Sequence, residues 1–379
     1  MAKMTPKERF LAAINGEKAD RLPVTTHHVM QSFLNHQLDG ASVPEFFDRF
    51  GLDPINWILP VKGDETAGTY KNDMDMIVSD NWRIETEDVS GQEYPTKRYN
   101  IITPKGTLTT VMQSNEHTSW VTEHLIKEKK DIDLIGEFCP SPLCDVAVVN
   151  KEANEYGEKG LLRSHIVCFD IFGQPGTWQD ASCLYGIEKL MMATFDDPEW
   201  VHSFLEILNN RKAAYIKSMS GARYDILELG GGDASTTVIS PDIFEKFVAP
   251  YDSRLVELAH EAGQRIVYHT CGGMMPILES IAAMKVDAME TFTPPAMGGD
   301  TDLEEARRRL GSKMCMIGGF DQFHYFTGCS PEETRAEVRR CFEAAGYNGA
   351  YIICPSDHFF EADLANLEAF ADEAKKCVY

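Results

Sequence analysis

The sequence predicts an α/β fold, a (β/α)8 TIM barrel, on the strength of two observations. Short apolar runs alternate with amphipathic segments from about residue 160 to the C-terminus. Six such runs occur there, and two earlier ones, "RLPVTTH" from residue 21 and "INWILPV" from residue 55, bring the expected strands to eight. Strands that alternate with helices pair in parallel, as an open doubly wound sheet or as a closed barrel. The eight strands favour the barrel.

The six later strands are expected at residues 161–173, 224–230, 265–271, 286–292, 313–320 and 350–356. The helices between them carry their own start and stop signals. "SPDIFE" and "SPEETR" place Ser240 and Ser330 as N-caps, each followed by a proline and an acidic residue in the first turn. Gly263, Gly311 and Gly346 stand where helices are expected to end.

Residues 65–125 interrupt this alternation. The stretch "NWRIETEDVSGQEYPTKRYNIITPKGTLTTVMQS" has β-branched and aromatic runs separated by Gly and Pro turns, which is typical of antiparallel hairpins. We therefore expect one barrel domain over residues 1–379, with residues 65–125 inserted as a β-hairpin subdomain near the C-terminal mouth.

The composition restricts the classes of partner. The 379 residues include 36 Lys and Arg against 59 Asp and Glu, a net charge of −23, which disfavours nucleic acid and anionic membrane. The chain has no apolar run of about 18 residues, as a membrane span needs, and its N-terminus lacks a signal-peptide core. Ten cysteines are too few for a disulfide scaffold. We expect a soluble protein of the reducing cytoplasm.

The strand ends predict a metal site, because functional groups of such barrels come from the C-terminal ends of the strands. His269 and Cys271 are two residues apart at the end of a strand and so face the same side. Cys354 ends the last expected strand, across the same mouth, and Glu290 follows one strand beyond Cys271. One imidazole and two thiolates suit Zn²⁺, with Glu290 as a displaceable fourth ligand. The alternative is that the His-x-Cys pair only packs.

Other strand-end residues are candidates for binding substrate or for acid and base catalysis. This group comprises Asp233, Glu228, Tyr268, Asp321 and His28, with His27, Asp170, Asp357 and His358 at equivalent positions. A strand-end acid that caps the following turn is an equally good interpretation of Asp233 and Glu228. Aromatic residues expected to line a substrate pocket are Phe172, Trp178, Phe320 and Phe326, and packing in the barrel core is the alternative for each.

Several stretches together resemble the uroporphyrinogen decarboxylase superfamily, over residues 4–375. "TPKERFLAAINGEKADRLPV" is similar to the opening helix and first strand of that family, and "GGGDASTTVISPDIFEKFVAPYDSRLVELAHEAG" to its fourth-strand loop and long helix. "YHTCGG", "IGGF" and "CPSDH" resemble its later barrel loops. The superfamily contains decarboxylases and zinc-dependent methyltransferases that work with corrinoid proteins.

The segment after the first strand, "THHVMQSFLNHQLDG", has no arginine, whereas the decarboxylases carry an arginine-rich stretch there that holds the carboxylates of the tetrapyrrole. The resemblance therefore implies the methyltransferase branch, with His269, Cys271 and Cys354 as zinc ligands and Glu290 as a less certain fourth. The stretches "ITPKGTL" and "EHTSWVTEHLIK" resemble the O-demethylase methyltransferases.

The resemblance implies transfer of a methyl group from a small-molecule donor, such as an aryl methyl ether, to the cob(I)alamin of a corrinoid protein. Four alternatives stay open. They are a methylcobalamin:thiol or tetrahydrofolate methyltransferase, a decarboxylase, and a non-catalytic zinc protein. A homodimer is compatible with each of them.

Overall fold

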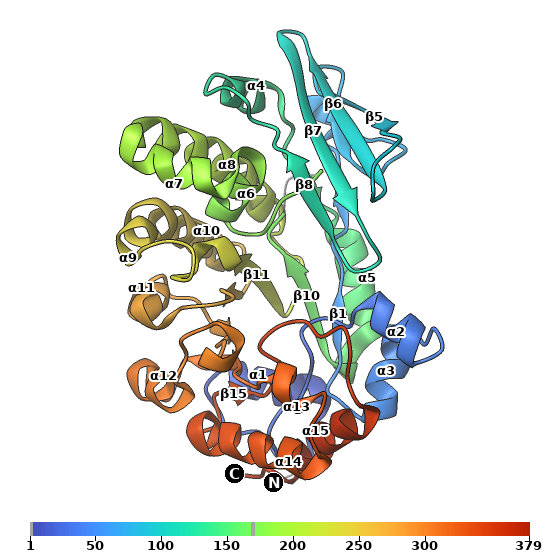
Figure 1. Ribbon diagram of the computed structural model, residues 1–379, viewed down its shortest axis with the longest axis vertical. Coiled ribbons are helices and arrows are strands. Elements are labelled where there is room, and N and C mark those ends of the chain that lie inside the picture. The colour runs from blue at the N-terminus through green and yellow to red at the C-terminus, as the bar shows by residue number, and fades with distance from the viewer. Residues whose placement is uncertain (1–2, 168–170) are drawn as a thin grey trace.

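The structure is a computed structural model that describes residues 3–167 and 171–379. Asp170, one of the predicted strand-end residues, lies outside the described residues. The predicted parallel α/β architecture is confirmed, since a central parallel sheet is surrounded by helices (Figure 1). The segment around Leu22 lies beside the C-terminal end of the chain, because the Leu22 amide donates a hydrogen bond to the carbonyl of Cys377 at 2.8 Å.

The central sheet has seven parallel strands in the described residues, paired in chain order. They are β1 (Ile55–Trp57), β10 (Leu161–His165), β11 (Ile226–Gly230), β12 (Ile266–His269), β13 (Ala288–Thr291), β14 (Cys315–Gly318) and β15 (Tyr351–Ile352). Beyond β15, Val24 forms a parallel bridge with Ile353. The carbonyl of Val24 accepts a hydrogen bond from the amide of Asp53, at 2.7 Å, just before β1. The extended segment around Val24 therefore lies between the last strand and the first.

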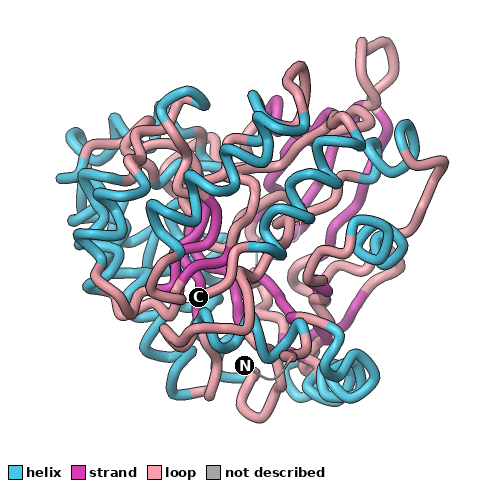
Figure 2. Tube along the Cα trace, turned by 90° about the horizontal axis from the view of Figure 1, so that it is seen from below, coloured by secondary structure: helices cyan, strands magenta, loops and turns pink. Residues whose placement is uncertain are grey.

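The helices follow the strands, as the sequence predicted. The described helices are α1 (Pro6–Ile14), α2 (Gln31–Gln37), α3 (Val43–Phe50), α4 (Asp131–Phe138), α5 (Val146–Tyr156), α6 (Thr177–Tyr185), α7 (Ile187–Asp196), α8 (Pro198–Ser218), α9 (Pro241–Ile243), α10 (Ala249–Glu261), α11 (Leu278–Ala283), α12 (Leu303–Leu310), α13 (Gln322–Tyr325), α14 (Pro331–Cys341) and α15 (Leu364–Lys376). Figure 2 shows the central strands enclosed by these helices.

The predicted caps are present at several helix ends. The hydroxyls of Ser240 and Ser330 accept hydrogen bonds from the amides of Ile243 and Glu333, which satisfies donors that a helix start leaves free. Gly311 follows α12 with a φ of 72°, and Gly263 follows α10 with a φ of 78°. Gly346 instead belongs to a wide helical turn, Phe342–Gly346, that prolongs α14. No helix of the described part of the chain has the length and apolarity to cross a membrane.

Antiparallel strands lie between β1 and β10 in the chain. A four-stranded antiparallel sheet is formed by β5 (Arg83–Asp88), β6 (Thr96–Thr103), β7 (Gly106–Ser114) and β8 (Ser119–Glu123). Two smaller pairs are β2 (Val61–Lys62) with β9 (Leu143–Cys144), and β3 (Thr69–Lys71) with β4 (Ile77–Ser79). The long strands project beside the central sheet (Figure 1).

Apolar side chains form the floor inside the central sheet. Each strand of the sheet contributes at least one of them, and α1 contributes Phe10, Ala13 and Ile14. The strand members are Ile55, Leu161, Ile226, Val267, Ala288, Cys315, Ile317 and Ile352, and Cys354 follows β15. A larger apolar cluster fills the space between the sheet and the outer helices. This apolar floor fixes which residues of each strand face inward.

Candidate active site

The side chains above the apolar floor are charged or metal-ligating. Residues two apart on a strand share a face, so the inward positions following the floor are Trp57, Arg163, Glu228, His269 and Glu290. The register brings them close, because Trp57 pairs with Arg163 and His269 pairs with Glu290, while Glu228 pairs with His165, two residues beyond Arg163. The C-terminal ends of the parallel strands thus bring residues from distant parts of the chain into one polar layer.

Arg163 is the cation at the centre of this layer. Its side chain is fully buried, and Nη2 lies 3.3 Å from Oε2 of Glu228 and 3.1 Å from both carboxylate oxygens of Glu290. The guanidinium also lies 4.4 Å from the centroid of the Trp57 ring. Burial raises the pKa of Glu290, but the charges of Arg163 and His27 and the hydrogen bond with His269 together hold that pKa below its ordinary value. Both carboxylates are therefore ionised.

His269 joins the polar layer to the predicted thiol. Its Nδ1 lies 3.0 Å from Oε1 of Glu290, and its Nε2 lies 2.9 Å from Sγ of Cys271. Burial lowers the pKa of His269, but the thiol of Cys271 and the carboxylate of Glu228 outweigh it and raise the pKa well above the ordinary value. A carboxylate on Nδ1 fixes the ring and directs Nε2 toward the sulfur.

Cys354 is buried beneath this pair. It lines a small cavity together with His27, His269 and Glu290. Burial and then the carboxylate of Glu290 raise the pKa of its thiol. Cys354 thus shares this small cavity with His269 and Glu290, whereas Cys271, which contacts Nε2 of His269, is not among the residues that line it. The carboxylate oxygens of Glu290 contact Arg163 and Nδ1 of His269.

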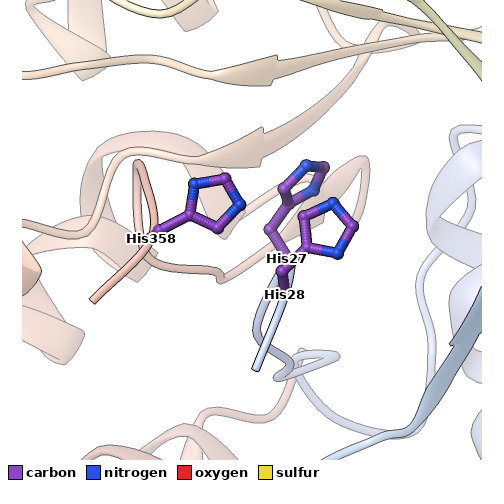
Figure 3. Close-up of side chains that lie close together, drawn as sticks. All are labelled: His27, His28 and His358. Atoms are coloured by element: carbon purple, nitrogen blue, oxygen red, sulfur yellow. The ribbon is translucent and has the colours of Figure 1, made fainter. Parts of the chain in front are cut away.

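Four further histidines surround the layer. Nε2 of His27 lies 3.2 Å from Glu228, and Nδ1 of His165 lies 3.3 Å from the same carboxylate. The rings of His28 and His358 stack with centroids 5.1 Å apart (Figure 3). Burial, followed by the charge of His27, lowers the pKa of His28, and burial also lowers that of His27. These two imidazoles are neutral at physiological pH.

A cavity of about 490 Å³ opens above the polar layer. Its walls carry all five histidines, Glu228 and Cys271, together with loop residues, Gly231 and Gly232 among them. A second cavity, of about 790 Å³, shares Asp357 and His358 with the first. It extends to Glu116 and His117, in the turn between β7 and β8. The volume of the first cavity suits a small organic molecule.

The backbone beside Glu290 is strained. Thr291 and Phe292 have φ values of 85° and 49°, in the left-handed region that non-glycine residues rarely adopt. Gly318 packs so closely on this bend that a Cβ there would lie 2.3 Å from the carbonyl oxygen of Thr291. Strain of this kind costs about 1–3 kcal/mol per residue and concentrates at functional sites. The bend ends β13 directly after Glu290, whose carboxylate belongs to the polar layer.

Three other predicted site residues point elsewhere. Tyr268 is fully buried on the outer face of β12, where its hydroxyl donates to Asp252 at 2.9 Å. Asp321 caps α13 and accepts a hydrogen bond from the His324 amide at 3.0 Å. Asp233 is half-buried and accepts a hydrogen bond from the hydroxyl of Ser182, on α6. None of the three is among the residues that line the 490 Å³ cavity.

The four predicted pocket aromatics are likewise absent from the residues lining that cavity. Trp178, Phe320 and Phe326 are fully buried in the apolar cluster beneath the helices. Phe172 lines a separate small cavity with Ile171, on the side facing β7 and β8. Packing in the core, the alternative considered for these residues, describes the positions of the three buried aromatics.

Sequence reasoning missed Arg163 and His165. Arg163 lies in "LLRSH", where the apolar neighbours made the strand read as ordinary core. A charged residue at the centre of an apolar strand was itself a signal, since a buried arginine requires a buried anion. His165, two residues later on the same face, follows from the same reasoning.

Comparison with known proteins defines the family. The profile of the uroporphyrinogen decarboxylase family, "Uroporphyrinogen decarboxylase (URO-D)", matches residues 173–377, more than half of the chain. The chain belongs to this family. The resemblance predicted from the sequence is therefore confirmed. The matched part includes β11 to β15 and most of the cavity wall.

Curated relatives within this family carry different activities. A methylated-thiol–coenzyme M methyltransferase of Methanosarcina mazei is 27% identical over 161 residues, 42% of this chain and 41% of the relative. A uroporphyrinogen decarboxylase of Neisseria meningitidis serogroup C is 30% identical over 172 residues, 43% of this chain and 44% of the relative. The aligned part thus spans less than half the length of these relatives.

A solved structure matches over nearly the whole chain. It is a methyltransferase from Methanosarcina mazei, with a TM-score of 0.63 and 14% sequence identity, covering 98% of this chain and 99% of that one. At this identity the match establishes the fold. The fold shared with that structure thus extends over the N-terminal part, which the family profile does not match.

Proposed function

We propose that this protein is a zinc-dependent methyltransferase that moves a methyl group between a small molecule and the cobalamin of a corrinoid protein. The observation that carries the proposal is the pairing of Nε2 of His269 with Sγ of Cys271, at 2.9 Å, on the wall of the 490 Å³ cavity. An imidazole nitrogen and a thiol sulfur side by side at a cavity are a ligand pair for a soft or borderline metal ion.

The donor set fits zinc. His269, Cys271 and Cys354 supply one nitrogen and two sulfurs, and three protein ligands leave a position for substrate. Glu290 was predicted as a fourth ligand, and its contacts favour a different role. Its Oε1 lies on Nδ1 of His269, away from Cys271, so that the carboxylate orients the imidazole. We therefore assign His269, Cys271 and Cys354 as ligands and Glu290 as a positioning residue.

Zinc held there would supply a Lewis acid that stabilises negative charge on a leaving oxygen or on a thiol sulfur. The residues of the chain do the rest. Glu290 and Arg163 hold the imidazole of His269 in one orientation, and the two thiols release their protons when the metal binds. Glu228, His28 and His165 line the cavity and are placed to contact the small molecule.

Two directions of transfer are compatible with this site. In the first, a methyl group leaves a donor such as an aryl methyl ether and passes to cob(I)alamin. In the second, a thiol takes the methyl group from methylcobalamin. The relative from Methanosarcina mazei, a methylated-thiol–coenzyme M methyltransferase, supports the second candidate. The hairpin stretches that resemble the O-demethylase methyltransferases support the first, which we prefer.

We propose that the eight parallel segments, with Val24 as the eighth, close as a (β/α)8 barrel and that β5 to β8 form its inserted subdomain. The turn between β7 and β8 contributes Glu116 and His117 to the cavity next to the active site, which supports a position at the mouth. A corrinoid protein has to reach this mouth. The ten cysteines and the composition support work in the cytoplasm.

The test is metal analysis followed by two activity assays. Zinc-loaded protein is mixed with a free cob(I)alamin and phenyl methyl ethers, and separately with methylcobalamin and thiols, while the cobalamin absorbance is followed. We expect one zinc bound to the thiolate site per chain and methyl transfer in one of the two assays. Cys271→Ala and His269→Ala are expected to lose this zinc and to slow transfer by at least about 100-fold, the loss of several kcal/mol of Lewis-acid stabilisation.

A matched control is Cys329→Ala, because Cys329 is half-buried beside Thr334 and lies outside the cavity wall. Its zinc content and rate are expected to stay within about twofold of the wild type. Zinc-loaded protein that transfers no methyl group in either direction would overturn the proposed function. Unchanged zinc content in the His269 and Cys271 variants would overturn the assigned ligands.

A further inference from the structure

A second group of metal-ligating side chains lies at the cavity, apart from the thiols. His27, His28 and His358 each offer a ring nitrogen, and these three nitrogens lie within 4.8 Å of one another. His27 and His28 follow the Val24 segment at one edge of the sheet, and His358 follows β15. Figure 3 shows the ring of His358 facing the neighbouring rings of His27 and His28 across a short gap. All three line the 490 Å³ cavity.

Carboxylates orient two of the three rings. Nδ1 of His358 lies 3.1 Å from Oδ1 of Asp357. With the proton of the neutral ring on Nδ1, the lone pair of Nε2 is free to bind a metal ion. Nε2 of His27 lies 3.2 Å from Glu228, and its Nδ1 lies 3.6 Å from Glu290. A carboxylate on one imidazole nitrogen, with the other nitrogen left for the ion, is the arrangement that surrounds metal-bound histidines in proteins, and His358 has it with Asp357.

His28 has no carboxylate partner. Among the described residues, neither of its ring nitrogens makes a hydrogen bond or an ion pair, although the side chain is half-buried. The ring contacts other rings, with its centroid 4.4 Å from that of His27, 4.5 Å from that of Trp57 and 5.1 Å from that of His358. The ring nitrogens of His28 are therefore available to a ligand at the cavity, because no other group of the described chain bonds to them.

A different group, His27 with Glu228, His269 and Glu290, also has ligand atoms within 4.8 Å of one another. There, however, Arg163 already supplies a positive charge, at 3.1–3.3 Å from both carboxylates. A divalent cation would have to displace a fully buried guanidinium. The three-histidine group contains no such internal cation, and it is therefore the better candidate for a metal site.

We propose that His27, His28 and His358 bind a second divalent transition-metal ion, independent of the thiolate site. Three imidazoles without a thiolate or a carboxylate suit Zn²⁺, Co²⁺, Ni²⁺ or Cu²⁺ rather than Mg²⁺ or Ca²⁺, which prefer oxygen ligands. Three protein ligands leave positions open toward the cavity. Water, or an oxygen or carboxylate of the molecule bound in the cavity, completes the coordination.

The test is a Co²⁺ titration of metal-free protein, with bound metal counted after equilibrium dialysis and the absorption spectrum recorded. Thiolate ligands give Co²⁺ a strong near-ultraviolet charge-transfer band, and imidazole ligands alone do not. We expect two equivalents per chain, one with the thiolate band and one without. The variant with His28→Ala and His358→Ala keeps the thiolate band and binds one equivalent. The variant with Cys271→Ser and Cys354→Ser loses the band and keeps the other equivalent.

The control is His36→Ala, since His36 has an exposed side chain (59%) and is expected to leave both equivalents in place. Asp357→Asn deletes no ligand, and it should weaken Co²⁺ binding at the histidine site by about 10- to 100-fold without changing the thiolate band. The thiolate band reports whether each histidine variant is folded. A wild type that binds only one equivalent, with the thiolate band, or a His28 and His358 variant that still binds two, overturns the proposal.

Discussion

The two faces of strand β12 carry buried ionisable groups in opposite situations. On the inner face, His269 joins Glu290 and Cys271 at a cavity. On the outer face, the hydroxyl of Tyr268 donates to Asp252, which α10 contributes. Asp252 is fully buried, and neither residue lines the cavity. One strand therefore supports a reactive layer on one side and a sealed polar contact on the other.

The difference lies in how charge is balanced. Arg163 lies within 3.3 Å of both inner carboxylates, and their pKa values stay below the ordinary range although both are buried. Burial raises the pKa of Asp252 to about 6, and the hydroxyl of Tyr268 and the charge of Lys212 compensate only in part. A buried carboxyl group alone thus does not mark a functional site. Balanced charge next to a cavity is the better sign.

The largest expected effect is on the inner face. Arg163→Met keeps much of the side-chain volume and leaves Glu228 and Glu290 buried without their cation. We expect the free energy of unfolding to fall by about 3–5 kcal/mol, the usual cost of breaking a buried ion pair on one side. Urea denaturation followed by circular dichroism measures it. Adding Glu290→Gln to this variant removes one uncompensated charge and should restore part of the loss.

The control for this prediction is Arg254→Met. Arg254 pairs with Glu206 at 2.9 Å, but both side chains are about half exposed, so the expected loss is at most about 1 kcal/mol. Equal losses in the two variants would contradict the central role assigned to Arg163.

The next effect is on the outer face and depends on pH. Asp252→Asn keeps an oxygen for the hydroxyl of Tyr268 and cannot ionise. Because the folded protein raises the pKa of Asp252 from 3.8 to about 6, the wild type gains stability from this group at low pH and loses it as pH rises from about 4 to about 7. The variant lacks this loss. We expect its stability relative to the wild type to rise by up to about 3 kcal/mol over that range.

The carboxylates of the inner face make stability depend on pH in the opposite direction. The pKa values of Glu228 and Glu290 are lowered, so their contribution is present above about pH 4.5 and is lost as pH falls. Denaturation of wild type and Asp252→Asn at a series of pH values separates the two. A difference between them that stays constant from about pH 4 to about pH 7 would show that Asp252 does not titrate in this range.

Much of the site followed from the period of the strands. Glu228, His269, Glu290 and Cys354 were found because parallel strands end at one edge and alternate residues share a face. The same rule separates Tyr268 from His269, one position away, so its selection as a substrate-binding candidate ignored the alternation. Trp178, Phe320 and Phe326 lie where helices pack on the sheet, which depends on three-dimensional contacts that strand periodicity does not encode.

The ion pairs of Arg163 could not be predicted from the sequence for a similar reason. Its partners Glu228 and Glu290 lie 65 and 127 residues away in sequence. The pairing of β10 to β13 in the parallel sheet brings them together. The fold class needed just the local alternation of strand and helix, and this is why it was the easier prediction.

The smallest effect decides what Glu290 does. Glu290→Gln removes the carboxylate charge that accepts the hydrogen bond from Nδ1 of His269. If this carboxylate only orients the ring, zinc affinity should fall by about 10- to 100-fold. The thiolate spectrum of the Co²⁺ form should then keep its position. A direct ligand would instead change that spectrum when it is replaced. Glu228→Gln is the matched control, since Glu228 is similarly buried and also pairs with Arg163 but lies 4.0 Å from Nδ1 of His269. Because hydrogen-bond strength falls steeply beyond about 3.2 Å, this control should weaken zinc binding less than Glu290→Gln does. Competition with a chelating dye measures both affinities, and equal losses would mean that the charge of the polar layer, rather than one oriented hydrogen bond, holds His269 in place.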